Sequence, residues 1–164
     1  MSTGTGRRTS LAIATVIPAR RNYLRVSTYS EHDLPLESLW VIGNDTVVDF
    51  AWLSSRAFWL WTHVVRHNIS SATTHTAYMM FPAPPLGRKN RNRLEIAADS
   101  VLRSRGFLMA GGSLLDLYDT MPEQLQWAHD ELDAVAEDLL DIPAHSDEAD
   151  VMRCVLSRYH STGS

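Results

Sequence analysis

The stretch TMPEQLQWAHDELDAVAEDLL, residues 120–140, is the most regular segment of the sequence. Its apolar side chains recur three or four positions apart, which is the period of an amphipathic α-helix. Thr120 and Glu123 have the spacing of a capping box, and Pro122 falls in the first turn, where a missing N–H costs little. The stretch therefore predicts a helix with one buried and one acidic face. Its apolar positions are Leu125, Ala128, Leu132, Val135 and Leu139.

Helical signals continue on both sides of this stretch. Residues 90–105 place apolar side chains on one face, and Gly106 is a candidate C-terminal stop. Ser113 is placed to cap a short turn, and Pro143 to end the long helix. Asp147 then caps a last helix with an apolar stripe, and residues 161–164 are expected to be a disordered tail. The second half is therefore predicted to be a helical domain over residues 86–160.

The first half has a different pattern. Residues 10–17, 22–29, 39–42, 46–52 and 74–81 are short runs rich in β-branched and aromatic side chains, which is typical of strands. A turn at residues 43–45 predicts a hairpin, and residues 54–67 predict an inserted helix capped by Ser54 or Ser55. The proline cluster at residues 82–85 predicts a stiff junction. We therefore expect an α+β fold, with a partial, strand-rich domain over residues 1–85.

Charge divides the chain in the same way. Residues 1–105 carry 13 Arg and Lys against 7 Asp and Glu, whereas residues 106–164 carry 2 against 12. Such a split indicates that the basic half faces an anionic partner, although the acidic residues can equally be the solvated faces of helices. Cys154 is the only cysteine, which excludes an internal disulfide, and no apolar stretch is long enough to span a membrane. A cytoplasmic location is expected.

The sequence lacks the motifs of the common catalytic centres. No G-x-G-x-x-G and no G-x-x-x-x-G-K-[ST] is present, and the one lysine, Lys89, has no acidic pair just upstream. His63 and His67 lie four apart, but a third metal ligand would have to come from far along the chain, such as His75. His129 lies among acidic residues and is expected to be a hydrogen-bonded structural histidine. We therefore predict no catalytic residues, no metal site and no bound cofactor.

Several motifs, in order, resemble the C-terminal third of the Type IIL (MmeI-like) restriction–modification methyltransferases. The most specific are LLDLYD at residues 114–119, MPEQL at residues 121–125, and the Ala128-His129 and Leu132-Asp133 pairs. Residues 20–24 (RRNYL), 53–56 (LSSR) with Trp61, and 78–84 (YMMFPAP) resemble further family motifs upstream. The resemblance covers roughly residues 17–142.

This resemblance implies part of a DNA target-recognition domain followed by a helical C-terminal domain. In the full-length family S-adenosylmethionine and Mg²⁺ are bound by parts that have no counterpart here. Met79 and Ala83 replace the family's Asn and Trp, and residues 67–77 are shorter than its recognition segment. The chain is therefore expected to be no enzyme on its own, but a DNA-binding fragment of an adenine-N6 methyltransferase.

Double-stranded DNA is the expected partner, together with a separate methyltransferase chain. Long basic side chains and the polar loop supply groups for phosphates and base edges. Two alternatives stay open at this point: a protein-interaction module built on the acidic helices, and a nonfunctional remnant of a split gene. The candidate DNA-binding residues are Arg20, Arg21, Arg25, Arg66, His67, Asn68, His75, Arg88, Lys89, Arg91 and Arg93.

Overall fold

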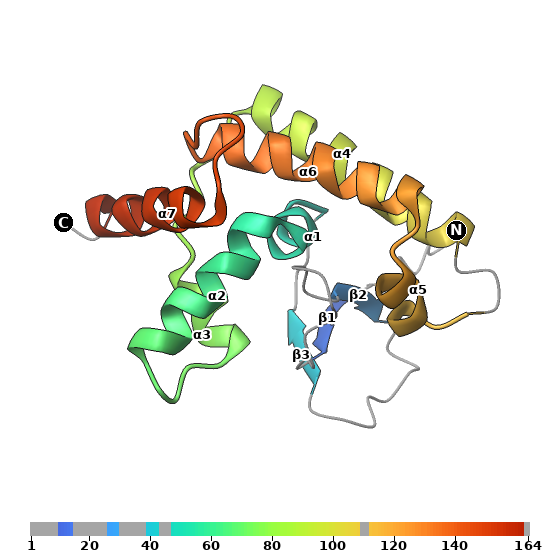
Figure 1. Ribbon diagram of the computed structural model, residues 1–164, viewed down its shortest axis with the longest axis horizontal. Helices are drawn as coiled ribbons and strands as arrows, with labels where there is room; N and C mark the ends of the chain where they lie inside the picture. Colours follow the sequence, from blue (N-terminus) through green and yellow to red (C-terminus); the bar gives the residue numbers. More distant parts are fainter. Residues whose placement is uncertain (1–9, 15–25, 30–38, 43–46, 109–111, 163–164) are drawn as a thin grey trace, which may run out of the picture.

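The computed structural model describes residues 10–14, 26–29, 39–42, 47–108 and 112–162. Three short strands, β1 (Ser10–Ala14), β2 (Val26–Tyr29) and β3 (Leu39–Ile42), form an antiparallel sheet in the order β2-β1-β3. Every regular element described after residue 46 is a helix (Figure 1). These are α1 (Val47–Ser54), α2 (Arg56–Asn68), α3 (Thr74–Met80), α4 (Arg88–Leu108), α5 (Leu114–Thr120), α6 (Glu123–Leu139) and α7 (Glu148–Thr162).

The predicted α+β fold with a strand-rich first domain is wrong. Two segments predicted as strands, residues 46–52 and 74–81, form α1 and α3, so the hairpin around residues 43–45 does not form either. α1 is buried on nearly all sides, and such a segment shows no helical period that would distinguish it from a buried strand. α3 is short, and its start is fixed by a capping box between Thr73 and Thr76 that the apolar pattern does not reveal.

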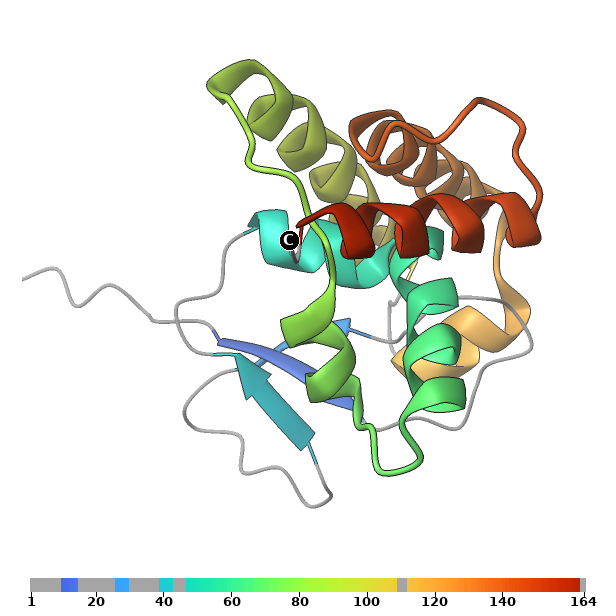
Figure 2. The same cartoon turned by 90° about the vertical axis from the view of Figure 1, so that its left-hand side faces the viewer.

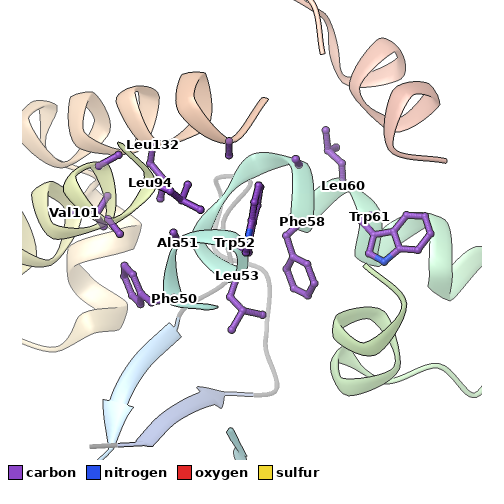
Figure 3. Packing of buried hydrophobic residues seen from close by; sticks show 14 of the residues in the cluster. Phe50, Ala51, Trp52, Leu53, Phe58, Leu60, Trp61, Leu94, Val101 and Leu132 are labelled. Carbon is purple, nitrogen blue, oxygen red and sulfur yellow. The ribbon is translucent and has the colours of Figure 1, made fainter. Parts of the chain in front are cut away.

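The core forms where α4 and α6 lie side by side across α1. Leu94 and Val101 of α4 and Leu132 of α6 are fully buried beside Ala51 of α1 (Figure 3). Leu132 is therefore buried, as its place on the predicted apolar face requires, and of the two packing partners that we considered for it, residues 94–102 and the last helix, it packs against the first. The same apolar cluster runs from Val48 to Val155, so α1 and α2 share one core with the helices of the second half.

A second packing region joins α2, α3 and α7. The indole Nε1–H of Trp61 donates to the Ala77 carbonyl oxygen at 2.9 Å, which fixes α3 against α2. The ring of Phe81 packs edge-on against Phe58, with 5.3 Å between centroids. Arg158 of α7 donates from Nε to the Pro82 carbonyl oxygen at 3.1 Å. The proline junction at residues 82–85 is thus packed against α7 and is not an isolated linker between the two predicted domains.

Helix ends agree with the sequence at some positions only. Ser55, Ser113 and Asp147 accept backbone N–H groups at the starts of α2, α5 and α7, as predicted. The prediction of a capping box between Thr120 and Glu123 is wrong, because Pro122 is the N-cap of α6 and makes no side-chain cap hydrogen bond.

Two C-terminal ends also differ from expectation. α4 continues through Gly106 to Leu108, so the predicted stop at that glycine is wrong. α7 runs to Thr162, so residues 161–162 of the expected tail are helical, and residues 163–164 lie outside the described residues. Among the described helices, none has both the length and the apolar character needed to cross a bilayer.

Candidate nucleic-acid interface

The first group of predicted DNA-binding residues lies at the C-terminal end of α2. The apolar stripe of this helix is buried, which leaves Arg66, His67 and Asn68 exposed on the opposite side. The Asn68 side-chain amide donates to the Val64 carbonyl oxygen at 2.7 Å. Arg66 and His67 lie in the last turn, where positive charge is favoured by the helix dipole. This helix end therefore presents cationic and amide donors to the outside.

His75 lies near this end of α2, on α3, and is half-buried. α3 is held by the Trp61 hydrogen bond and also by Tyr78, whose hydroxyl donates to Asp49 Oδ1 at 2.9 Å. Burial, and then the hydrogen bond and charge of Asp49, raise the pKa of Tyr78 to about 12. The tyrosine therefore remains a hydrogen-bond donor at neutral pH, and α3 has a fixed position relative to α1 and α2.

The second group occupies the N-terminal end of α4. Arg88, Lys89 and Arg91 are exposed, and with Asn92 and Glu95 they line a shallow pocket. The first turn of α4 contains no acidic residue. Cations at this end oppose the helix dipole, whereas a phosphate there would be favoured by both the dipole and the side chains. The arrangement suits an anionic ligand.

Arg93 differs from its three neighbours in the second group. Its Nη2 lies 2.8 Å from Asp138 Oδ2, so it forms an ion pair that ties α4 to α6. The side chains of Arg93 and Asp138 are 41% and 61% exposed, so this pair contributes little to stability but does compete with a phosphate.

The structure does not bring the two groups together. In both views the start of α4 lies at the top of the helical part and the end of α2 lies near its bottom (Figures 1 and 2). Arg20, Arg21 and Arg25 were also predicted to bind DNA, and they lie outside the described residues. Within the described part, the predicted residues thus form two separate cationic ends.

The side of α6 turned towards the α6–α7 loop would repel DNA. A groove there is lined by Asp130, Asp133, Glu137 and Asp138, together with Arg56. The Arg56 backbone N–H donates to Asp133 Oδ1 at 2.7 Å, and its guanidinium pairs with Glu137 at 2.7 Å. Arg56 therefore fastens the start of α2 to α6. This agrees with a scaffold role for the arginine of the LSSR motif.

A buried polar cluster lies beneath α4, α5 and α6. Arg105 donates from its guanidinium to the Tyr118 hydroxyl, which lies 2.7 Å from His129 Nε2. The Arg105 guanidinium also lies between the rings of Phe50 and Tyr118, 5.0 and 4.9 Å from their centroids. Arg105 was missed at the sequence level, although Tyr118 and His129 belong to the motifs that carry the family resemblance.

Burial, followed by the charge of Arg105, lowers the pKa of His129 to about 3, and a hydrogen bond with the Ser54 backbone opposes this. His129 is therefore neutral at physiological pH, and its Nε2 can accept a hydrogen bond from the Tyr118 hydroxyl. The predicted structural role of this histidine is confirmed by these contacts.

His63 and His67 were considered as a metal pair. His63 Nδ1 lies 3.0 Å from the Trp59 carbonyl oxygen, and its ring packs edge-on against the indole of Trp59. Over the described part of the chain, no group of three His, Cys, Asp or Glu side chains is arranged to hold a metal ion.

This chain is similar in fold and in sequence to parts of larger known proteins. A structure of the Type IIL restriction–modification enzyme MmeI in complex with DNA superposes with a TM-score of 0.83 at 21% identity, covering 94% of this chain and 21% of that one. DNA methyltransferase A of Bacillus subtilis (strain 168) is 27% identical over 133 residues, which are 78% of this chain and 15% of that protein. The chain thus has the fold of one part of that restriction–modification enzyme and spans about a fifth or less of the length of these two relatives.

The family model described as MmeI, C-terminal domain, matches residues 86–163. Residues 86–163 are therefore similar to the C-terminal domain of MmeI-like restriction–modification enzymes. The resemblance predicted from its motifs is confirmed.

Proposed function

We propose that this chain is the DNA-binding, target-recognition end of an MmeI-like adenine-N6 methyltransferase and carries no catalytic centre of its own. It binds double-stranded DNA in the cytoplasm, and a separate chain supplies the methyltransferase with its S-adenosylmethionine. The observation that carries this proposal is the superposition of nearly the whole chain on an enzyme whose structure contains DNA. In this proposal residues 1–85 belong to the recognition domain and residues 86–160 to the helical C-terminal domain.

The charge distribution supports DNA as the ligand. Arg66 at the end of α2 and Arg88, Lys89 and Arg91 at the start of α4 are exposed, and no ion pair within the described residues involves them. Exposed cationic side chains bind phosphates without distinguishing the bases, and their binding releases counterions from the DNA. We therefore expect binding that is weak, with a Kd of about 10⁻⁴–10⁻⁶ M, and insensitive to sequence.

Charge reversal tests whether both cationic ends contact DNA. Arg66→Glu should weaken binding to all duplexes alike and lower the salt slope by about one, and Lys89→Glu with Arg91→Glu by about two. Arg20→Glu with Arg21→Glu should also lower it by about two. Fluorescence anisotropy with a mixed-sequence duplex of about 20 base pairs measures these slopes.

Arg153→Glu is the matched control, since this side chain is 72% exposed on α7 and is not a predicted contact. Equal weakening by Arg153→Glu and Arg66→Glu would show that only net charge matters, and the assigned contacts would then be wrong.

The absence of a catalytic centre has its own test. The purified chain, incubated with duplex DNA, tritiated S-adenosylmethionine and Mg²⁺, should give only background methyl incorporation. The sequence contains neither a G-x-G-x-x-G motif nor the Asn/Asp-Pro-Pro-aromatic run with which amino-methylating enzymes hold the target nitrogen. Incorporation that persists through repurification and scales with protein concentration contradicts this part of the proposal.

A further inference from the structure

The outer side of α4 and α6 exposes large apolar side chains. Ile96 and Phe107 of α4 are 63% and 76% exposed, and Trp127 of α6 is 65% exposed. α4 and α6 lie side by side, so these three residues lie on neighbouring helices (Figures 1 and 2). Large apolar side chains gathered on one side of a protein mark a surface that binds another protein. We name this surface, built on Ile96, Phe107 and Trp127, the outer face.

The two helices run antiparallel, and their relative register is fixed. At one end the Arg93–Asp138 ion pair joins them. In the middle, Ile96 shares a groove with Glu131 and Ala134. At the far end, Phe107 lies in a second groove with Gln124. This register places Arg103 at about the level of Trp127.

The two helices contribute opposite charges to the outer face. On α4, Lys89 and Arg103 follow the same helical stripe as Ile96 and Phe107, with Asp99 beside them. On α6, acidic side chains surround Trp127 on its exposed side, one turn away or less. These are Glu123, Asp130 and Glu131.

We propose that the outer face is a self-association surface on which a second copy of this chain packs to form an antiparallel four-helix bundle. A two-fold axis parallel to the helices lays α4 of one copy on α6 of the other, and the same contact occurs twice. Each basic stripe then meets an acidic one, and Arg103 of one copy lies over the turn from Trp127 to Glu131 of the other. Arginine over an indole ring beside a carboxylate is a favourable arrangement.

A second copy fits this face better than DNA does. The acidic side chains of α6 would repel phosphates, whereas they match the cations of α4. A contact made by two helices of each copy is at the small end of specific interfaces, which bury about 1,200–2,000 Å² in total, and so corresponds to a weak dimer rather than a permanent one. We therefore expect a dimer that dissociates on dilution.

Sedimentation equilibrium on the full chain, without DNA, tests this proposal. The wild type should shift from monomer towards twice the monomer mass as concentration rises, and Ile96→Glu should raise the dimer Kd about tenfold or more. Met79→Glu is the matched control, because Met79 is 68% exposed on α3, away from the outer face. Circular dichroism of each variant reports whether the fold is kept.

Charge exchange tests the predicted arrangement itself. Arg103→Glu and Glu131→Arg should each weaken self-association, and an equimolar mixture of the two variants should recover it as a heterodimer. A wild type that stays monomeric at every concentration overturns the proposal, as does a mixture without recovery or equal loss with Met79→Glu. Lys89 is the one assigned DNA contact on the outer face, and none of the variants in this test changes it, so either proposal can fail while the other stands.

Discussion

Replacing Leu132 with aspartate is expected to destabilise the fold by about 4 kcal/mol, since it removes a buried side chain and puts an unpaired charge into the core. Leu132 is 0% exposed, and it faces α4 and α1 at the centre of the helical layer (Figure 3). Urea unfolding followed by circular dichroism measures the loss. A protein of ordinary stability would be close to unfolded with this change.

Ala134→Asp is the matched control for this prediction. Ala134 is exposed on the same helix, two residues further on, so it introduces the same charge into water and should change the unfolding free energy by about 0.5 kcal/mol. Similar losses for the two variants would show that the buried face of α6 is assigned wrongly.

Acidification from pH 7 to pH 5 is expected to cost the fold about 2 kcal/mol through His129 alone. The pKa of His129 is about 3 in the folded chain, against an ordinary value of 6.5. Below pH 6.5 the unfolded chain takes up a proton that the folded chain does not, so this loss of stability grows as the pH falls towards 3. Urea unfolding at several pH values measures the slope.

His129→Gln should flatten this slope, because glutamine keeps a hydrogen-bond acceptor near Tyr118 but does not titrate. If His129→Gln and the wild type lose stability equally between pH 7 and pH 5, another group is responsible for the acid sensitivity.

The helical spacing of apolar residues in the second half of the sequence predicted the helices there well. α6 has one clear buried face and one clear exposed face, so its extent and its central buried residue follow directly from the spacing of its apolar side chains. The prediction of a strand at residues 46–52 was wrong for the opposite reason. Six of the eight residues of α1 are buried, so no polar face identifies this segment as a helix. Thr120 is the last residue of α5 and Met121 is the left-handed C-cap of that helix, with φ 42°, so Thr120 is not the N-cap of α6.

The candidate site could be predicted only as a set of residue types. Charge identified Arg66, Lys89 and Arg91 as exposed cations, but their separation depends on how α2 and α4 cross, which no local pattern encodes. Arg93 illustrates the same limit, because its partner Asp138 is 45 positions away in sequence. The sequence did not predict that Arg105 is buried, since an arginine in an amphipathic helix is normally assigned to the exposed face.

The structure also relates the two halves more closely than charge alone indicated. The basic half and the acidic half meet in pairs such as Arg56 with Glu137 and Arg93 with Asp138. Part of the charge asymmetry therefore holds the helices together, whereas the exposed cations at the end of α2 and the start of α4, and Arg103 further along α4, take part in none of these ion pairs.

The salt dependence of duplex binding by the wild-type chain tests the proposed function most directly. Anisotropy titrations of one mixed-sequence duplex at a series of salt concentrations should give a log K that falls linearly with log salt, with a slope of about 0.9 for each phosphate contacted. Four or more contacts at the two cationic ends predict a slope of about −4 or steeper. No binding by folded protein at low salt, or binding that salt does not weaken, would contradict recognition of DNA through these cations.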